Sequence, residues 1–563
     1  MALMLAMSHR ASADDEIDVT VSGSPVGRHS SRDAAAASTV LRREDLASPG
    51  ADAGHELTRV PGVQVQRSGG GSDLATASIR GTTSAQTPVY LAGIRLNDDI
   101  SGTADLSTVP LWMLDRIEVY RGHSPFGLES NGIGGAILFE PRLAPGLLLR
   151  SGLTAGSWGQ RSIYGAVGVG SKRSSALFAV RRESSDNDYP YLDNAGTAYT
   201  TTDDRWLTRR NAQQTTTDAW AIARVNASHS TQWTLVTNVF ERSQGITGLL
   251  SVPAERTHAN VSRELLGLSS RTSFHCGLRE ACYVTSATSL LRAGVSLYDP
   301  AQELSLGSFR LDSRSKRINQ RFEIHWPIAD VFEFGTLLGG STETLEITRP
   351  SIVSLDATRH SGTLGIGPDL RIFPGVRLLG IAQLEAENTH ASTQPTSSVQ
   401  PIARLGASVE PISGLTFVAN AGLYARVPVL GELYGTSAFV VGNSALNAER
   451  GTNRDLGIRY NAHSRAVSSM LELFVFRQDI DNLVAWQRSS FGQIKPYNVG
   501  TARLQGIEAS GALEVWNLLH LEAVTTALDP RDVTPNRTQK NDIIPFRSRL
   551  VVDSTVEIHT RNA

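Results

Sequence analysis

Apolar and polar residues alternate with a period of two in many stretches of the second part of the chain. The clearest examples are residues 322–326, 415–424 and 507–515, with Val418 as an exception. Successive side chains of a β-strand point to opposite faces, so this pattern predicts strands with one apolar and one polar face. Such strands suit a membrane β-barrel, and also a soluble sandwich, solenoid or propeller, although no repeat of fixed length supports the last two. Long polar stretches, expected to connect strands, lie at 184–211 and 389–400.

The first part of the chain has a mixed pattern that predicts a compact α+β domain. A helical stretch is expected at 41–60, ended by a Pro-Gly pair. Short segments rich in β-prone residues follow at 62–66, 77–80, 88–91, 116–121 and 136–140. We therefore expect one domain at 25–145 and a larger, mainly β domain at 146–563.

The composition excludes several classes of protein. The 563 residues exceed one ordinary domain, and 53 Lys and Arg against 55 Asp and Glu leave a formal net charge of −2. Nucleic-acid-binding proteins usually carry a basic excess, so no nucleic acid is expected as a partner. No run approaches the ~18 apolar residues of a membrane-spanning helix. A secreted β-rich enzyme is an alternative, but the sequence has no Gly-x-Ser-x-Gly motif and no cluster of His and Cys ligands, so we expect no enzyme and no cofactor.

The first 13 residues have features of the end of a secretory signal peptide. Residues 1–7 are apolar, and residues 11–13 form a small-x-small cleavage site before an acidic run. A disordered tail is the alternative. The two cysteines, Cys276 and Cys282, lie in a polar stretch, and a disulfide across a surface loop fits an exported protein. Two free thiols are an alternative, whereas a zinc site is disfavoured because the ligand set is incomplete.

An acidic segment is a candidate calcium site. Asp186, Asp188 and Asp193 offer carboxylate oxygens, which are the ligands that Ca²⁺ prefers. The alternative is a solvated loop, because most loops rich in Asp and Asn bind nothing.

Several motifs of the first domain resemble the plug domain of TonB-dependent outer-membrane transporters. They are PGVQV at 61–65, SIRG at 78–81, VYLAGIRLN at 89–97, LDRIEVYRG at 114–122, SPFG at 124–127 and NGIGGAI at 131–137. Motifs of the second part resemble the barrel of the same family, at 188–197, 426–428, 432–435, 442–443, 446–450, 481–483, 497–500 and 506–508. No single motif is specific, but their order along the chain is.

This resemblance implies a fold, a location and a function. The fold is a large antiparallel transmembrane β-barrel of the 22-stranded type, with the α+β plug in its lumen. The location is the cell outer membrane, in contact with its lipid, and the protein is a monomer. The function is import of a scarce solute, such as a ferric siderophore, another metal chelate or cobalamin, through displacement of the plug. The energy is transmitted by TonB from its inner-membrane energising complex, and the sequence has no Walker-type phosphate-binding loop that would supply it otherwise.

The resemblance also implies roles for individual residues. Residues 14–24 take the place of the TonB box, which pairs with TonB by strand addition, and its core is Asp18, Val19, Thr20, Val21 and Ser22. The plug's first strand is the alternative for this segment. Residues expected to anchor the plug to the barrel wall through charge-assisted hydrogen bonds, rather than to be solvated, are Arg80, Arg116, Glu118 and Arg121. Residues expected to contact the solute, rather than to form solvated loop tips, are Gln66, Arg67, Ser72, Asp73, Asn97, Asp98 and Asp99.

The end of the chain departs from the family pattern. The family usually continues for several strands after a sequence like IPFRS, which lies at 544–548 here, whereas this chain stops at Ala563. Residues 146–563 number 563 − 146 + 1 = 418, which at ~10 residues per strand allows 22 strands only with short connections. We therefore expect the last strands to be missing. The alternative function is a truncated or receptor-only remnant that binds solute without transport.

Overall fold

A computed structural model describes the chain from residue 33 onwards, with gaps. The described residues are 33–43, 46, 52–68, 73–128, 132–143, 145–194, 197, 199–249, 252–277, 281–304, 310–349, 352–391, 395–436, 440–488, 493–516, 518–535 and 542–558. The predicted leader at 1–13, the TonB-box segment at 14–24 and Ser72 lie outside them. Within these ranges no helix is long and apolar enough to cross a membrane.

The first domain is an α+β unit built on a five-stranded sheet with the order β1-β6-β7-β4-β5. Its neighbouring strands are antiparallel, except for the parallel pair β4 and β7. A second, two-stranded sheet pairs β2 with β3. The elements are β1 (Ser38–Arg42), α1 (Ala53–Leu57), β2 (Val63–Arg67), β3 (Ala75–Ile79), η1 (Ser84–Gln86), β4 (Val89–Leu91), β5 (Ile94–Arg95), η2 (Leu106–Thr108), η3 (Leu111–Met113), β6 (Leu114–Arg121) and β7 (Gly135–Pro141).

The predicted helix at 41–60 is wrong over most of its length. The helix α1 has only five residues, and Leu41 belongs to β1, where it pairs with Ile117 of β6. Val40 and Leu41 are fully buried. Pairing with a central strand satisfies the backbone and buries these side chains, and this outweighs the local sequence pattern that predicted a helix ended by a Pro-Gly pair.

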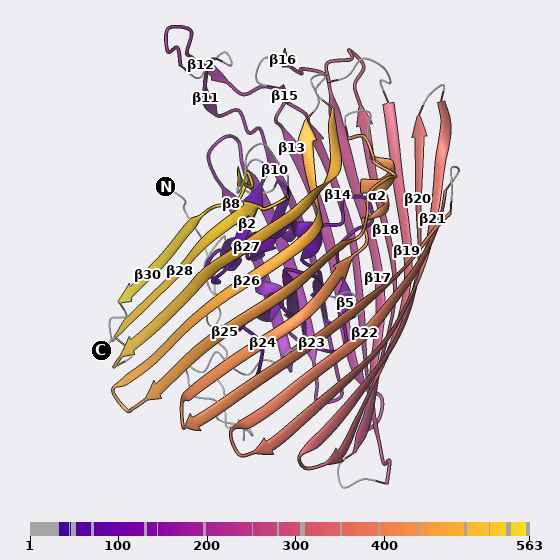
Figure 1. Ribbon diagram of the computed structural model, residues 1–563. Coiled ribbons are helices and arrows are strands. Elements are labelled where there is room, and N and C mark those ends of the chain that lie inside the picture. The colour runs from indigo at the N-terminus through magenta and orange to yellow at the C-terminus, as the bar shows by residue number, and fades with distance from the viewer. Residues whose placement is uncertain are drawn as a thin grey trace.

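The second domain is an antiparallel sheet that forms a barrel wall around the indigo N-terminal domain (Figure 1). The strands pair in chain order from β8 to β28, and β28 also pairs with β29 and β30. The wall strands are β8 (Gly146–Ala155), β9 (Arg161–Gly170), β10 (Ser174–Ser185), β13 (Gln214–Asn226), β14 (Thr231–Gly245), β17 (His258–Phe274), β18 (Cys282–Tyr298), β19 (Arg310–Ala329), β20 (Phe332–Arg349), β21 (Ile352–Phe373), β22 (Val376–Ala391), β23 (Thr396–Ile412), β24 (Leu415–Arg426), β25 (Glu449–His463), β26 (Val467–Arg488), β27 (Ile494–Val515), β28 (Leu519–Asp532), β29 (Asp542–Ile543) and β30 (Leu550–Ile558). The connections contain β11 (Pro190–Asp193), β12 (Arg205–Thr208), β15 (Gly248–Leu249), β16 (Val252–Pro253) and α2 (Leu430–Tyr434).

The described part of the wall has 19 strands, including the two-residue β29, which is fewer than the 22 of the family type and agrees with the expectation of an incomplete set of strands. The estimate that 22 strands could just fit into this length of chain assumed ~10 residues per strand. In fact β21, β26 and β27 have 22 residues each, so fewer strands use the same length of chain. For the same reason the stretch at 389–400 is not simply a connection, since it contains the ends of β22 and β23.

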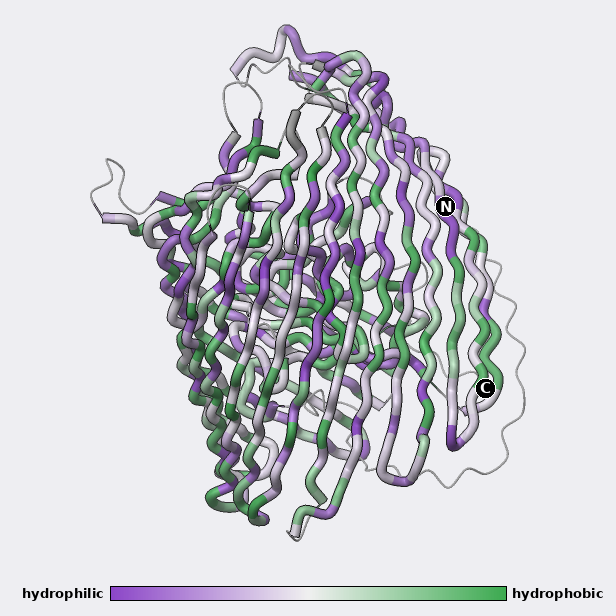
Figure 2. The backbone as a smooth tube through the Cα atoms, turned by 90° about the vertical axis from the view of Figure 1, so that its right-hand side faces the viewer, coloured by the Kyte–Doolittle hydropathy of each residue, from purple (hydrophilic) through white to green (hydrophobic). Residues whose placement is uncertain are grey.

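The wall is apolar on its outer face and polar on its inner face, as the alternation predicts. On β19, Ile318 and Phe322 are 46% and 43% exposed, whereas Arg317 and Arg321, on the opposite face, are buried. Figure 2 shows hydrophobic and hydrophilic residues interspersed along the wall strands that face the viewer. The inner face can therefore hold a polar domain, while the outer face suits lipid.

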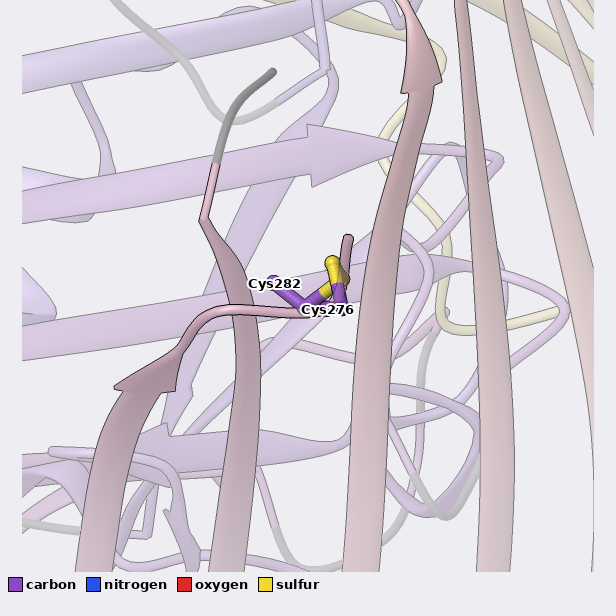
Figure 3. The surroundings of a disulfide bond; sticks show 2 residues. All are labelled: Cys276 and Cys282. Carbon is purple, nitrogen blue, oxygen red and sulfur yellow. A yellow bond between two sulfur atoms is a disulfide. The ribbon is translucent and has the colours of Figure 1, made fainter. Parts of the chain in front are cut away.

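The two ends of the barrel differ in their connections. At one end the turns are short, as at residues 374–375 between β21 and β22. At the other end the connections are long, such as 186–213 and 427–448. Cys276 and Cys282 form a disulfide between β17 and β18, at the short-turn end, with their Cα atoms 5.8 Å apart (Figure 3).

Candidate functional site

Arg80 joins the first domain to the barrel wall. It follows β3 and its side chain is fully buried. Its Nε and Nη2 donate to the carboxylate of Glu508 on β27 at 2.9 and 3.0 Å, and its Nη1 donates to Asp455 on β25 at 2.9 Å. The guanidinium also lies 4.6 Å from the ring centroid of Phe476. Such a paired arrangement is the one in which a buried charge is tolerated.

Arg121, at the end of β6, shares one of these carboxylates. Its Nη1 donates to Glu508 at 3.0 Å and its Nη2 donates to Glu472 on β26 at 3.3 Å. Arg459 on β25 completes the network by donating to Glu472 at 2.8 Å and to the backbone carbonyl oxygen of Ala36 at 2.5 Å. Two arginines of the first domain are therefore held by one carboxylate of the wall.

The other two predicted anchors lie elsewhere. Arg116 donates to Glu118 within β6 at 2.8 Å, and the Tyr120 hydroxyl donates to the same carboxylate at 2.7 Å. Arg80 and Arg121 thus contact the wall, whereas these bonds of Arg116 and Glu118 stay inside the first domain.

Two glycines allow the close approach around this network. Gly62 has φ +77°, and a Cβ there would lie 2.1 Å from the Glu508 carboxylate. Gly122 has φ +78°, and a Cβ there would lie 2.6 Å from Arg80 and 2.3 Å from Asn453. Both glycines belong to the motifs that the sequence analysis singled out, and both positions favour glycine on backbone and steric grounds.

His123 also contacts the wall, although the sequence analysis did not single it out. Its Nε2 lies 3.2 Å from Asp455, and its Nδ1 is hydrogen-bonded to the Tyr424 hydroxyl. Burial lowers the pKa of His123, while the neighbouring Asp455 acts in the opposite direction. The imidazole is a buried polar contact between plug and wall.

The loop at 97–102 has structural bonds where solute contacts were predicted. The side chain of Asn97 is fully buried and accepts from the Val89 backbone N–H at 2.8 Å. Asp98 accepts from the backbone N–H groups two and three residues further on, and so forms a turn. Asp99 accepts from Nη1 of Arg317 on β19 at 2.6 Å. These bonds fix the loop and join it to the wall.

The remaining predicted solute contacts are dispersed. Arg67 is paired with Asp52 in the same domain, Gln66 is exposed at the end of β2, and Asp73 is partly exposed. The structure does not bring them together with residues 97–99 into one pocket.

The predicted calcium site does not form. Asp193 lies 3.7 Å from Nε of Arg205, and Asp186 and Asp188 are exposed. Across the described ranges, no group of three or more His, Cys, Asp or Glu side chains is arranged to hold a metal ion.

A polar cavity of about 590 Å³ lies at the long-connection end of the lumen. Inward-facing side chains of β21 to β23 line it, among them Arg359, Glu387 and Gln400. Nε of Arg359 donates to the Thr389 hydroxyl at 3.0 Å and lies 3.5 Å from Glu387. The volume of the cavity falls in the range of small-molecule sites. The sequence did not reveal it, because residues of β21 to β23, β25 and β26 and of the connection at 427–448 build it.

The helix α2 lies between this cavity and the first domain. Leu433 and Tyr434 line the cavity. The Gly431 N–H donates to the carbonyl oxygen of Asp99 at 3.4 Å, and a Cβ at Gly431 would lie 1.7 Å from the carbonyl oxygen of Ile100. One side of α2 therefore contacts the cavity and another contacts the loop at 97–102.

Residues of the barrel motifs at 426–428, 432–435 and 446–450 hold α2 in place. Arg426 donates to Glu432 at 2.9 Å and also bonds to Glu449. Glu432 accepts from the Val429 backbone N–H at 2.9 Å, at the start of the helix. The Nη2 of Arg359 donates to the carbonyl oxygen of Pro428 at 2.7 Å. These motif residues position the wall of the cavity.

Comparisons with known proteins agree with this architecture. Residues 139–552 match the family model "TonB dependent receptor-like, beta-barrel", and residues 30–136 match "TonB-dependent Receptor Plug Domain". Similar solved structures include the copper transporter OprC (TM-score 0.71, 16% identity, 89% of this chain and 80% of that chain) and the FrpB iron transporter from Neisseria meningitidis (0.71, 12%, 93% and 84%). The siderophore receptor PirA from Acinetobacter baumannii is also similar (0.68, 13%, 93% and 84%).

The fold and these matches define an outer-membrane β-barrel with an N-terminal plug in its lumen. The chain belongs to the family of TonB-dependent receptors. It is a protein of the cell outer membrane and not an enzyme, and members of this family import scarce solutes. In this family the long connections lie outside the cell and the short turns face the periplasm, so the 590 Å³ cavity opens towards the exterior.

Proposed function

We propose that this protein imports a metal ion or metal chelate across the outer membrane by energy-coupled displacement of its plug. The observation that carries the proposal is the buried network in which Glu508 binds both Arg80 and Arg121. A plug held inside the barrel by buried ion pairs has to be displaced or rearranged before a solute can pass. The similar structures, described as copper, iron and siderophore proteins, support the class of solute.

The 590 Å³ cavity is the proposed solute site. It lies on the side of the barrel that meets the medium, and its arginine, carboxylate and amide groups suit a hydrophilic solute. A solute held there contacts Leu433 and Tyr434 of α2, whose Gly431 touches the plug loop at 97–102. Occupancy of the site can therefore shift the plug loop through α2.

TonB is the proposed source of energy. Val19 and Val21 alternate with Thr20 and Ser22, as expected of a strand that adds to a sheet edge. Force applied at this segment reaches the plug through residues that follow directly in the chain.

The solute is identified by comparing cells with and without the gene under limitation of iron, copper or cobalamin. We expect growth and uptake of one metal or chelate class to require the gene. If purified protein binds such a solute but the cells take none up, the receptor-only alternative is supported and transport is rejected.

Gly431→Ala is expected to reduce uptake by about tenfold or more, because the added Cβ displaces α2 from the plug loop. Overpacking of this kind costs ~1–3 kcal/mol, and the obstructing atom is a backbone oxygen, which cannot rotate away. Labelled solute uptake is the measurement. Gly165→Ala on β9 is the matched control, because a Cβ there meets no atom within 4 Å. Equal uptake by both variants would refute the role of α2.

A further inference from the structure

The side chain of Phe126, in the plug motif at 124–127, rests on bare backbone of the wall. Gly335 of β20 and Gly367 of β21 are directly opposite each other. A Cβ at Gly335 would lie 2.4 Å from the Phe126 ring, and a Cβ at Gly367 would lie 2.7 Å from it. The ring of His325 on β19 lies edge-on to the phenyl ring, with 6.1 Å between the centroids. Phe126 therefore fills a socket that exists because both strands carry glycine there.

The wall side of this socket is held in place by contacts within the wall. Nδ1 of His325 lies 2.7 Å from the carboxylate of Glu333 on β20. The imidazole also stacks on Tyr283 of β18, with 4.3 Å between the ring centroids. The two glycines belong to paired strands of the same wall. The part of the contact that can move is therefore the plug loop that carries Phe126.

The sector of the wall around the socket holds the plug by packing and not by polar bonds. No described side chain of β20 or β21 forms a hydrogen bond or ion pair with the described residues of the first domain. The strands to either side do form such bonds. Arg317 of β19 donates to Asp99 at 2.6 Å, and Arg404 of β23 donates to the carbonyl oxygen of Ser124 at 3.4 Å. A passage beside β20 and β21 can therefore open without separating a buried ion pair from its partner, which is a costly step.

Cavities lie at both ends of this sector. The 590 Å³ cavity at the exterior end includes Arg359 of β21. A second cavity, of about 640 Å³, lies at the short-turn end, where Arg371 of β21 and Ala34 of the plug contribute to its lining. Gly367, against which Phe126 packs, lies between these two arginines along the strand. The socket is thus placed between an entry cavity and an exit cavity.

The inner face of β21 is accessible between the exterior cavity and the socket. Leu364 and Ile366 are exposed on the outer face. Ser361 and Thr363 occupy alternate positions and so face the lumen, and both are nevertheless partly exposed. Short polar side chains therefore line an accessible surface that leads towards Gly367.

We infer that the solute passes from the exterior cavity to the second cavity along β20 and β21, and that Phe126 is the gate of this passage. When the plug is pulled, the loop at 124–127 withdraws the ring from its socket, and the two glycines leave an opening although the wall does not move. This inference rests on the proposed function, because it names the path that the imported solute takes.

Phe126→Ala tests the gate in planar bilayers, where neither TonB nor solute is needed. We expect a steady conductance at least fivefold above that of the wild type, because the socket is empty while the ion pairs of the plug are intact. The matched control is Trp112→Ala, which removes a plug ring that stacks on Tyr164 of β9 with 5.5 Å between the centroids, and it should conduct like the wild type. Heat-modifiable migration in gels shows that each variant is folded. A closed Phe126→Ala channel, or an equal leak in Trp112→Ala, overturns the gate.

The double variant Phe126→Ala with Gly335→Leu moves the obstruction from the plug to the wall. We expect its conductance to return to within twofold of the wild type, because leucine occupies the place of the ring. Uptake should nevertheless fall at least tenfold, because this obstruction cannot leave with the plug. Uptake is measured in cells with radiolabelled ferric iron, copper and cobalamin, using whichever of them requires the gene.

These two readouts separate the gate from the proposed function. If wild-type cells import none of the three probes, the proposed function fails, while the conductance of Phe126→Ala still decides whether Phe126 closes a passage. If wild-type cells import one of them and the double variant takes it up at the wild-type rate, the solute does not pass the socket and the inference is wrong.

Discussion

Replacement of Glu508 by glutamine is expected to weaken the seating of the plug by about 3–5 kcal/mol, the usual cost of removing one partner from a buried ion pair. The effect is large because one carboxylate serves two arginines. Glutamine keeps the shape but leaves Arg80 with Asp455 and Arg121 with Glu472, so each guanidinium loses charge compensation in a buried site. A weakly seated plug should open the lumen.

Two measurements detect the weaker attachment of the plug in Glu508→Gln. Single-channel conductance in planar bilayers should show frequent openings, and cells should become sensitive to a large antibiotic that the outer membrane normally excludes. The matched control is Arg116→Gln, which removes the 38% exposed partner of a pair inside the plug and should leave both readouts near wild type. If Glu508→Gln shows no channel openings and no antibiotic sensitivity, the network does not hold the plug in place.

Replacement of residues 18–22 by a Gly-Ser segment of equal length is expected to abolish uptake and leave solute binding unchanged. The reason is that the solute cavity and the plug network lie elsewhere in the chain, whereas strand addition to TonB requires the Val19 and Val21 pattern. The same replacement at 27–31 is the length-matched control and should keep uptake. Uptake and binding are measured with the same labelled solute on the same cells.

Two results would remove this assignment. Normal uptake without residues 18–22 means that TonB is engaged elsewhere or not at all. A parallel loss of binding means that the segment is part of the plug's own structure, which was the alternative for it.

Local patterns predicted the fold because each depends on neighbours in the chain. The alternation along β19 follows directly from residues 322–326, since lipid and lumen lie on opposite faces. Gly62 and Gly122 marked close approaches of the plug to the wall, and Arg80 stands in another of the plug motifs, at 78–81. The partner Glu508, in contrast, follows from no local pattern, because 428 residues separate it from Arg80.

The errors arose where distant contacts override a local signal. Leu41 became part of a strand because β6 was available to pair with it. Asp99 was expected to contact the solute, yet Arg317 of the wall binds it. The solute cavity remained hidden because its Arg359, Gln400 and Tyr434 come from three separate parts of the chain. The lengths of the strands could not be predicted from the alternating pattern either, because polar residues continue the strands beyond the apolar belt.

A reversible tether between plug and wall tests the central claim most directly. Ala35 and Gly406 of β23 face each other, and a Cβ at Gly406 would lie 3.2 Å from that of Ala35, so a small widening reaches the ~3.5–4.5 Å between the Cβ atoms of a disulfide. The double substitution Ala35→Cys and Gly406→Cys, with both native cysteines changed to serine, places a cross-link between residues 18–22 and the body of the plug, where it stops a pulling force. We predict that oxidised cells take up no more solute than cells without the gene, that reduction restores uptake, and that solute binding stays within about twofold in both states. Uptake at the full rate while the cross-link is intact would contradict displacement of the plug.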